Sequence, residues 1–493
     1  MGLLSYLRAH LLRTQTPARN DLPPLRFTNT LSGEQEEFKP LGGPVKMYNC
    51  GPTVYDRQHI GNLRPYVFAD TLRRTLNTWG HPVEQVINIT DVGHLTGDNV
   101  GDADIGEDKL EAAAARKGQS AQTIAEEVTG WWFDDLDALG IERKRITFPK
   151  ATEYIGEIIA LVKTLEQKGY AYRTPDGVYY DTAKFSGYGK LGKVNIAGQL
   201  AGARVEENPH KKNAHDFALW KLSKEHESRQ QEWESPWGVG YPGWHIECTA
   251  MIFKLLGKQI DIHTGGVDHI PVHHNNEIAQ AEVLTQKQYV RYWMHNEFIT
   301  IEGKKISKSI GNTIYLYQIT DRGYSPRALR YLYLTAHYRS PMNFTWAAIE
   351  AADQALLRLN RMYLELPPSG MPADEKFAKG FYAALADDLD TPLAIARLWE
   401  AVRDPSMPPT VKRACLAIAD EALGLGLALP RKQVKLEVIP LSQLPEEVTE
   451  LIDEREQARL SKDFGIADDL RAKIERLGYT VKDSPEGPKV SKK

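Results

Sequence analysis

The chain has 493 residues, too many for a single hydrophobic core, so we expect several domains. Its 61 basic and 65 acidic side chains give a formal net charge of −4, which excludes a histone-like or polybasic protein. Only three cysteines occur, which excludes a disulfide scaffold and is typical of a reducing compartment. No window approaches 18 consecutive apolar residues, so we expect no membrane-spanning helix and no membrane partner.

The first 20 residues contain no acidic side chain and carry three arginines among five leucines. An organelle transit peptide has this amphipathic, acid-poor character, but we favour a short N-terminal extension of a cytosolic protein. We therefore expect a cytoplasmic location, with an organelle matrix as the alternative if residues 1–20 are a transit peptide.

A strand–helix–strand pattern follows this extension. Residues 45–49 alternate apolar side chains before Cys-Gly-Pro, a helical pattern ends near Gly80, and residues 83–90 form the second expected strand. Such a βαβ unit builds a parallel sheet, which binds ligands at the carboxyl ends of its strands. The residues expected at those ends are Cys50, Gly51, Thr53, Thr90 and Asp91.

Later segments predict an insertion and two helical domains. A helical pattern at 121–139 precedes a tyrosine-rich β-like stretch at 177–181, and Thr345 can cap a helix over 347–364. The fold class we expect is α/β: a Rossmann-like parallel-sheet domain with an insertion, then an α-helical bundle and a small, mainly helical C-terminal domain. The expected boundaries are 1–24 for the extension, 25–114 and 241–320 for the two halves of the sheet domain, 115–240 for the insertion, 321–430 for the bundle and 431–493 for the C-terminal module.

Two short motifs are typical of phosphate-binding segments. His59-Ile-Gly-Asn62 precedes the first helix, where Gly61 lets a phosphate approach the backbone and the helix N-terminus favours anions. Lys305-Ile-Ser-Lys308-Ser suits a mobile loop whose two lysines neutralise a departing pyrophosphate. Taken singly, each motif has an ordinary alternative: a turn glycine beside a surface histidine, or a solvated basic loop.

A third set of residues has the chemistry of a zinc site. Two thiols, an imidazole and a carboxylate, the ligand types and number of tetrahedral Zn²⁺, occur in the set Cys50, Cys248, His273 and Glu277. His273 and Glu277 are four residues apart, so a helix would place both on one face. His274 is a rival donor. The third cysteine, Cys415, is expected to be an ordinary core residue, because buried cysteines usually pack as small apolar side chains.

Together these segments resemble the cysteinyl-tRNA synthetases, which are class I aminoacyl-tRNA synthetases. The resemblance spans about residues 25–485 and includes the "HIGH"-type and "KMSKS"-type motifs of that class and Gly-Trp-His-Ile-Glu-Cys248. The fourth "HIGH" position is Asn62 here, and the second position of the lysine motif is Ile306. Because the chain inserts a segment after His94 that departs from the family pattern, the resemblance assigns no role to residues 93–109.

The resemblance implies an enzyme that joins L-cysteine to tRNA(Cys) through a cysteinyl-adenylate, with ATP as substrate and Mg²⁺ bound to it. It implies a monomer whose sheet domain is catalytic and whose C-terminal module reads the anticodon. One Zn²⁺ per chain would select the cysteine thiolate, because thiolate is a softer ligand than the hydroxyl of serine. The implied catalytic residues are His59, Asn62, Lys305 and Lys308. The implied ATP contacts add Gly61, Asp268 and Ser307, and the implied cysteine contacts are Gly51, Thr53, Thr90 and Trp244.

Two other functions fit parts of the same pattern. A cysteine ligase that passes cysteine to an amino-sugar would make the same adenylate but lacks a C-terminal anticodon module, so residues 444–485 argue against it. A catalytically inactive relative that only binds tRNA is contradicted by the intact His59, Lys305 and Lys308. Cysteine-dependent ATP–pyrophosphate exchange separates an enzyme from a binding protein, and charging of tRNA(Cys) separates the two enzymes.

Overall fold

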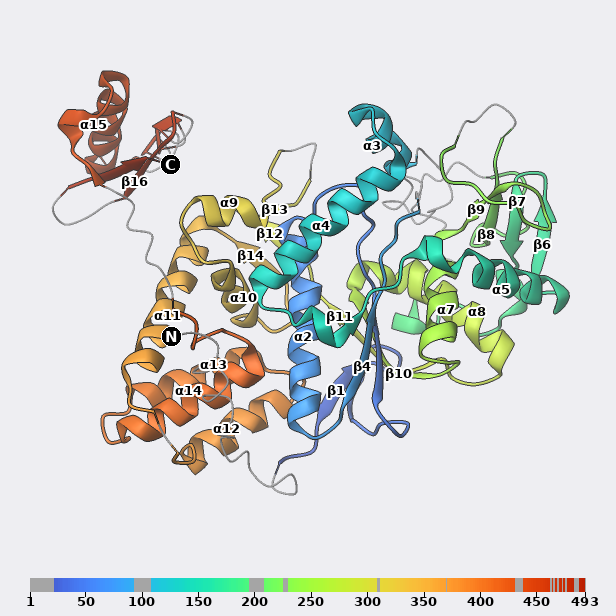
Figure 1. Ribbon diagram of the computed structural model, residues 1–493, viewed down its shortest axis with the longest axis horizontal. Coiled ribbons are helices and arrows are strands. Elements are labelled where there is room, and N and C mark those ends of the chain that lie inside the picture. The colour runs from blue at the N-terminus through green and yellow to red at the C-terminus, as the bar shows by residue number, and fades with distance from the viewer. Residues whose placement is uncertain are drawn as a thin grey trace. The chain divides into compact units, whose positions relative to one another are not determined.

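The computed structural model of the chain (Figure 1) describes residues 22–92, 108–194, 208–224, 229–307, 311–368, 370–430 and, with short gaps, 438–492. The chain divides into two compact units, one of Met1–Tyr315 with Arg327–Leu429 and the other of Leu316–Pro326 with Pro430–Lys493. Within the described ranges, no helix combines the length and the apolar character that crossing a bilayer requires.

A five-stranded parallel sheet forms the centre of the first unit. In spatial order its strands are β11 (Val290–Asn296), β10 (Ile260–Gly266), β3 (Val45–Asn49), β4 (Val83–Ile87) and β5 (Ile146–Thr147). From β3 the chain first adds β4 and then β5 on one side, and later adds β10 and then β11 on the other side. The crevice at such a reversal of strand order is where α/β sheets bind ligands. The α/β class and the strand predicted at 45–49 are confirmed.

Helices cover both faces of this sheet (Figure 1). On one face lies α2 (Ile60–Thr78), whose Leu72 and Leu76 pack in one core with Met47 of β3. On the other face lie α7 (Trp244–Leu255) and α8 (Asn275–Thr285), which share a second core with Tyr48 of β3. Because successive strand side chains point to opposite faces, the neighbours Met47 and Tyr48 serve different cores.

The insertion consists of helices followed by an antiparallel sheet. Its longer helices are α3 (Lys109–Lys117), α4 (Ala121–Leu139) and α5 (Ile155–Gln167). Its sheet has the order β6 (Ala171–Thr174), β7 (Gly177–Tyr180), β8 (Phe217–Leu222) and β9 (Gly240–Pro242). Short helical turns lie between these elements at η3 (Arg143–Arg145), η4 (Ala151–Tyr154), η5 (Thr182–Lys184) and η6 (Leu191–Lys193). The helix predicted at 121–139 is confirmed at both ends, since Ser120 caps it and Gly140 ends it with a left-handed φ of 80°.

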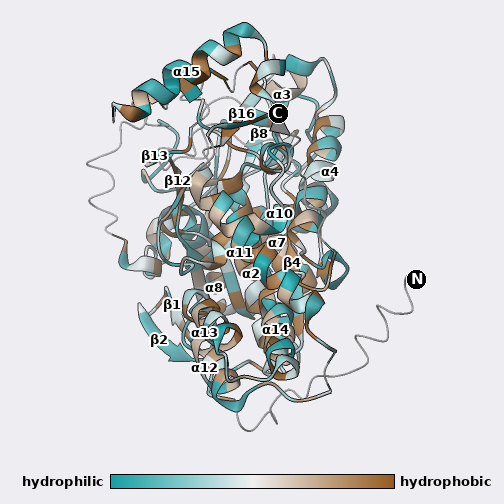
Figure 2. Ribbon diagram, turned by 90° about the vertical axis from the view of Figure 1, so that its left-hand side faces the viewer, coloured by the Kyte–Doolittle hydropathy of each residue, from teal (hydrophilic) through white to brown (hydrophobic). Residues whose placement is uncertain are grey.

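Two small sheets and a helical bundle complete the first unit. One sheet has the order β13 (Lys304–Lys305), β12 (Ile299–Ile301) and β14 (Met342–Phe344), and the other pairs β1 (Arg26–Asn29) with β2 (Glu34–Glu37). The β2 strand is hydrophilic throughout, as suits an edge strand (Figure 2). The bundle helices are α10 (Pro326–Leu334), α11 (Trp346–Glu365), α12 (Glu375–Ala386), α13 (Thr391–Arg403) and α14 (Pro409–Leu423).

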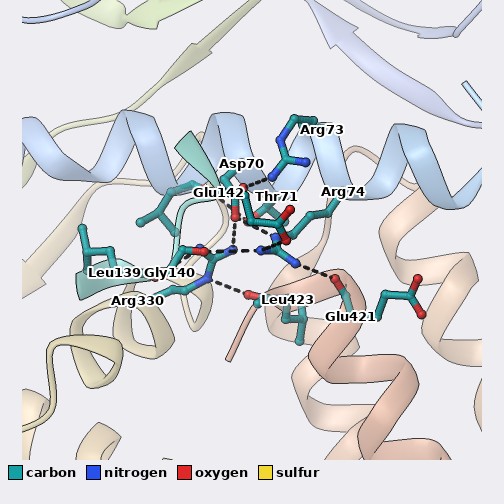
Figure 3. Close-up of polar contacts among 12 residues, drawn as sticks. Asp70, Thr71, Arg73, Arg74, Leu139, Gly140, Glu142, Arg330, Glu421 and Leu423 are labelled. Carbon is teal, nitrogen blue, oxygen red and sulfur yellow. Dashed lines mark hydrogen bonds and ion pairs between the residues drawn. The ribbon is translucent and has the colours of Figure 1, made fainter. Parts of the chain in front are cut away.

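A buried ion network joins α2 to the bundle and to the insertion (Figure 3). The Asp70 carboxylate accepts hydrogen bonds from Arg330 at 2.6 Å, from Arg74 at 2.7 Å and from Arg73. Arg330 also donates to the carbonyl oxygens of Leu423 and Leu139, where α14 and α4 end. Helix carboxyl ends carry partial negative charge, so they help to neutralise this arginine cluster.

The second unit is smaller. It contains α9 (Leu316–Asp321), η9 (Leu441–Gln443), α15 (Glu446–Leu460) and a sheet of the order β15 (Val438–Ile439), β17 (Lys489–Lys492) and β16 (Tyr479–Lys482). Its core is formed by Val448, Ile452, Ile474, Val481 and Val490. The sequence analysis predicts a mainly helical C-terminal module but not this antiparallel sheet, whose strands are short and in which Val438 pairs with the distant Ser491.

Candidate active site and metal centre

Several titratable side chains converge at the carboxyl ends of the central strands. Cys50 directly follows β3, and its backbone N–H donates to the carbonyl oxygen of Thr264 in β10 at 3.1 Å. His263 lies beside Thr264 in β10, and His295 lies near the end of β11. The parallel strands thus place a thiol and two imidazoles at one edge of the sheet. Helices α7 and α8 add further side chains to this group from one face of the sheet.

The four residues predicted as metal ligands lie together. One donor atom from each of Cys50, Cys248, His273 and Glu277 lies within 4.8 Å of the other three. A tetrahedral zinc ion with bonds of about 2.0–2.3 Å separates its donors by about 3.3–3.8 Å, so only a small contraction would be needed. Cys248, His273 and Glu277 are buried, whereas Cys50 is half-buried. This group could hold a metal ion, and its donor set fits zinc.

A second donor group overlaps the first. It keeps Cys50 and Glu277 but replaces the other two ligands by His263 and His274. The Cys50 Sγ lies 3.2 Å from His274 Nε2, and His263 Nε2 lies 3.1 Å from the Glu277 carboxylate. The rival donor His274 is therefore adjacent to the predicted ligands, and His263 is a neighbour that the sequence analysis did not identify.

The local fields favour a charged donor set. A hydrogen bond from Cys50 lowers the pKa of Cys248 to about 6, and His273 contributes in the same direction. Burial would raise the pKa of Glu277, but the imidazoles of His263 and His273 outweigh burial and lower it to about 2. Burial raises the pKa of Cys50. These shifts favour the thiolate at Cys248 and the carboxylate at Glu277, and the thiolate is the form of cysteine that binds metals.

More histidines lie behind this group. His274 Nδ1 lies 2.8 Å from His295 Nε2, and the other nitrogen of His295 lies 2.7 Å from the Thr30 hydroxyl. His245 Nδ1 lies 2.9 Å from His273 Nδ1. Such outer contacts orient ligand imidazoles in metal sites. The sequence analysis missed His245, His263 and His295, although the last two stand near the ends of strands where ligands are expected.

The residues predicted to hold cysteine come from three segments of the first unit. A Cβ added to Gly51 would lie 1.5 Å from the Asn88 carbonyl oxygen, so only glycine fits there, and the Gly51 N–H donates to Asn88 Oδ1 at 2.7 Å. Thr53 and Thr90 form a parallel β-bridge at the rim. Trp244 is half-buried, with its ring centroid 4.4 Å from that of His273. The structure therefore places Gly51 and Trp244 next to members of the donor group and pairs Thr53 with Thr90.

The two motifs predicted to bind phosphate are in contact. His59 caps α2 by accepting the Asn62 N–H at 3.3 Å, and a Cβ on Gly61 would lie 2.9 Å from the side chain of Ile306. Residues 305–314, which carry the lysine motif, form the lysine segment. The Ile60 N–H donates to the Ile314 carbonyl oxygen at 2.9 Å, which joins the start of α2 to the far end of this segment.

The lysine segment itself is closed by Asn312. The Asn312 amide donates to the Lys305 carbonyl oxygen at 3.0 Å and accepts the Ser307 N–H at 2.8 Å. Lys305 is exposed in β13, whereas Lys308 lies outside the described residues. Asp268 is exposed after β10, with its carboxylate 4.0 Å from the imidazole of His269.

The chain is similar to known proteins over nearly its whole length. Residues 37–354 match the family described as tRNA synthetases class I (C) catalytic domain, and residues 441–488 match the cysteinyl-tRNA ligase anticodon binding domain. A cysteine–tRNA ligase 1 of Burkholderia lata is 46% identical over 469 residues, covering 95% of this chain and 97% of its own length. A cysteine–tRNA ligase of Treponema denticola is 41% identical over 485 residues, covering 93% and 98%.

A solved structure agrees on the fold. A LeuRS of Agrobacterium radiobacter K84, solved in a ternary complex with tRNA and LeuAMS, superposes with a TM-score of 0.54 over 80% of this chain and 87% of its own. At 12% sequence identity this likeness concerns the fold alone.

Proposed function

Because the chain belongs to the cysteinyl-tRNA synthetase family, we propose that it joins L-cysteine to tRNA(Cys) at the expense of ATP, forming AMP and pyrophosphate. The observation that carries this proposal is the thiol-rich donor group of Cys50, Cys248, His273 and Glu277 at the ends of the central strands. It lies in the same unit as the contact between the "HIGH"-type motif and the lysine segment, made by Gly61 and Ile306.

The first step activates the amino acid. A carboxylate oxygen of cysteine bonds to the α-phosphorus of ATP, the bond to the β-phosphate oxygen breaks, and pyrophosphate leaves. His59 and Asn62 at the start of α2, with Lys305 and Lys308, would neutralise the phosphate charge that develops. Gly61 would let the triphosphate approach the backbone, Ser307 would contact the triphosphate through its hydroxyl, and Asp268 would contact the adenosine. Mg²⁺ would arrive with the nucleotide.

Selectivity for cysteine is assigned to the donor group. Zn²⁺ bound there would supply a soft Lewis acid that a thiolate ligates and that the hydroxyl of serine fills poorly. A pocket that judged shape alone would discriminate weakly between two such similar amino acids. Gly51, Thr53 and Thr90 would hold the backbone groups of the substrate, and Trp244 would line the pocket beside His273.

The second step transfers cysteine to tRNA. A hydroxyl of the 3′-terminal ribose attacks the carbonyl carbon of the adenylate, and AMP leaves. Residues 431–493, which include the segment similar to an anticodon binding domain, are proposed to read the anticodon, and residues 321–430 to bridge it to the sheet domain. This C-terminal similarity favours tRNA over an amino-sugar as acceptor. The monomeric state stays a prediction, which sedimentation of the purified chain checks.

Charging of tRNA(Cys), combined with a metal assay, tests the proposal. We expect cysteine-dependent ATP–pyrophosphate exchange, transfer of cysteine to tRNA(Cys) and one zinc ion per chain. Exchange without transfer would favour the amino-sugar ligase, and binding of tRNA without exchange would favour an inactive relative. Serine in place of cysteine is the control, and it should support neither reaction.

A further inference from the structure

Arg64, in the second turn of α2, is a buried cation that is neutralised by backbone dipoles. Its side chain is 2% exposed. One terminal nitrogen donates to the carbonyl oxygens of Glu297 and Phe298 at 2.8 and 3.2 Å, and the other donates to those of His337 and Ser340, both at 2.9 Å. Burial lowers the pKa of Arg64 to about 10, so the guanidinium stays charged at neutral pH. Four carbonyl contacts on one buried side chain make a specific clamp on two chain segments.

Both clamped segments lead directly into the sheet that carries the lysine motif. Phe298 immediately precedes β12, and Ser340 lies two residues before β14. The β12 strand pairs with β14 on one side and with β13 on the other, where Thr300 is opposite Lys305. Arg64 therefore binds the residues that lead into β12 and β14, and these two paired strands position Lys305 of β13.

The far end of the lysine segment is also tied to α2. The Ile60 N–H donates to the Ile314 carbonyl oxygen, and the Tyr333 hydroxyl donates to the Ile60 carbonyl oxygen at 2.5 Å. The Asn312 side chain closes the segment between these ties by bonding to Lys305 and Ser307. The segment that carries the motif is thus attached to the first two turns of α2 at both ends, and Arg64 makes the attachment at the entry.

We propose that Arg64 is a positioning residue for adenylate formation, which holds the β12–β13 hairpin against α2 so that His59 and Lys305 act on the same triphosphate. This inference rests on the proposed function. Displacement of a reacting group by about 1 Å can cost about 100-fold in rate, so a loose hairpin would impair the ATP half of the reaction. Lysine cannot replace Arg64, because a single ammonium cannot span two segments as the planar guanidinium does.

The test compares Arg64→Lys and Arg64→Met with Arg330→Lys in the full-length, metal-loaded protein. Arg330 is a matched control, since it is also buried and also donates to backbone carbonyl oxygens, but of Leu423 and Leu139. In cysteine-dependent exchange we expect both Arg64 variants to lower kcat/KM for ATP about tenfold or more, while KM for cysteine changes less than about twofold. Arg330→Lys should lower the unfolding temperature but leave kcat/KM for ATP within about twofold.

Hydrogen exchange supplies a readout independent of catalysis. In the Arg64 variants, amides of residues 297–307 should exchange faster than in wild type, while those of β3 and β10 stay protected. The inference would be overturned if the hairpin amides of the Arg64 variants exchanged hydrogen at the wild-type rate. It would also be overturned if these variants lost kcat/KM equally for ATP and for cysteine, in step with their loss of stability. If the wild-type protein itself shows no pyrophosphate exchange, the proposed function fails, and hydrogen exchange still decides whether Arg64 holds the hairpin.

Discussion

The Ile306 side chain packs against Gly61: a methyl group on Gly61 would come within 2.9 Å of both the Ile306 Cδ1 and the His59 ring. Two motifs that lie far apart in the sequence thus meet at the start of α2. Gly61 gives the room in which the imidazole and the lysine segment approach each other, and a nucleotide phosphate needs the same close approach to the backbone.

Gly61→Ala should therefore impair ATP use. The added methyl group must displace His59 or Ile306, so we expect cysteine-dependent pyrophosphate exchange to fall about 10- to 100-fold. Steady-state exchange kinetics measure the change. Gly130→Ala in α4 is the control, because nothing lies within 4 Å of the new methyl group; it should keep full activity and stabilise the helix by about 0.5–1 kcal/mol. Equal exchange rates for the two variants would show that the contact is unimportant.

Cys248→Ser should remove the metal. Serine offers a harder and rarely ionised oxygen, so we expect zinc content, measured by atomic absorption, and cysteine activation to fall together. Cys415→Ala is the matched control, since Cys415 is buried in α14 within the bundle and should keep both metal and activity. A Cys248→Ser protein that activates cysteine normally without bound zinc would refute the role of the metal in selectivity.

Variants of the two neighbouring histidines distinguish the overlapping donor groups. The group with His273 offers two cysteines, whereas the group with His274 offers one, and zinc favours the thiolate-richer set. His273→Ala should therefore lose zinc, and His274→Ala should retain most of it. Metal content per chain after dialysis measures both, and the reverse order would assign the metal to the group with His263 and His274.

Asp70→Asn should destabilise the first unit strongly. Burial would raise the pKa of Asp70, but the guanidinium groups of Arg330, Arg74 and Arg73 outweigh burial and hold it well below its usual range. Asparagine would leave the buried Arg330 and Arg73 without this counter-ion, which costs about 3–5 kcal/mol.

The pH dependence of this loss has a defined sign. Because the folded pKa of Asp70 lies below the unfolded value of about 3.9, the wild-type advantage should be fully present above about pH 5 and shrink as the pH falls. Urea unfolding of wild type and Asp70→Asn at pH 7 and pH 4 measures it. Equal stability at pH 7, or a difference that grows on acidification, would contradict the network in Figure 3.

Local patterns in the sequence predicted the elements that local physics determines. The strand at 45–49, the helix at 121–139 and the Thr345 cap of α11 depend on apolar spacing and on capping side chains within a few residues. The position of Cys50 followed from strand ends meeting at one edge of a parallel sheet, whereas its grouping with Cys248 of α7 was predicted from the chemistry of the donor set.

What the sequence left undetermined depends on distant pairing. In the sheet β15–β17–β16, Val438 pairs with Ser491. Because these residues are far apart in the sequence, no local pattern of apolar residues predicts this pairing. His295 contacts His274 of the donor group from twenty-one residues further along the chain, and the carbonyl partners of Arg64 lie more than two hundred residues away. Backbone carbonyl groups are the same in every residue, so no residue type marks such partners in advance.

Charging of tRNA(Cys) by the full-length protein, before and after removal of bound metal and in the presence of excess serine, tests the central claim most directly. The account predicts cysteine-specific charging that is lost with the metal and restored by Zn²⁺. Charging that persists unchanged in the metal-free protein, or that accepts serine while zinc is bound, would contradict it.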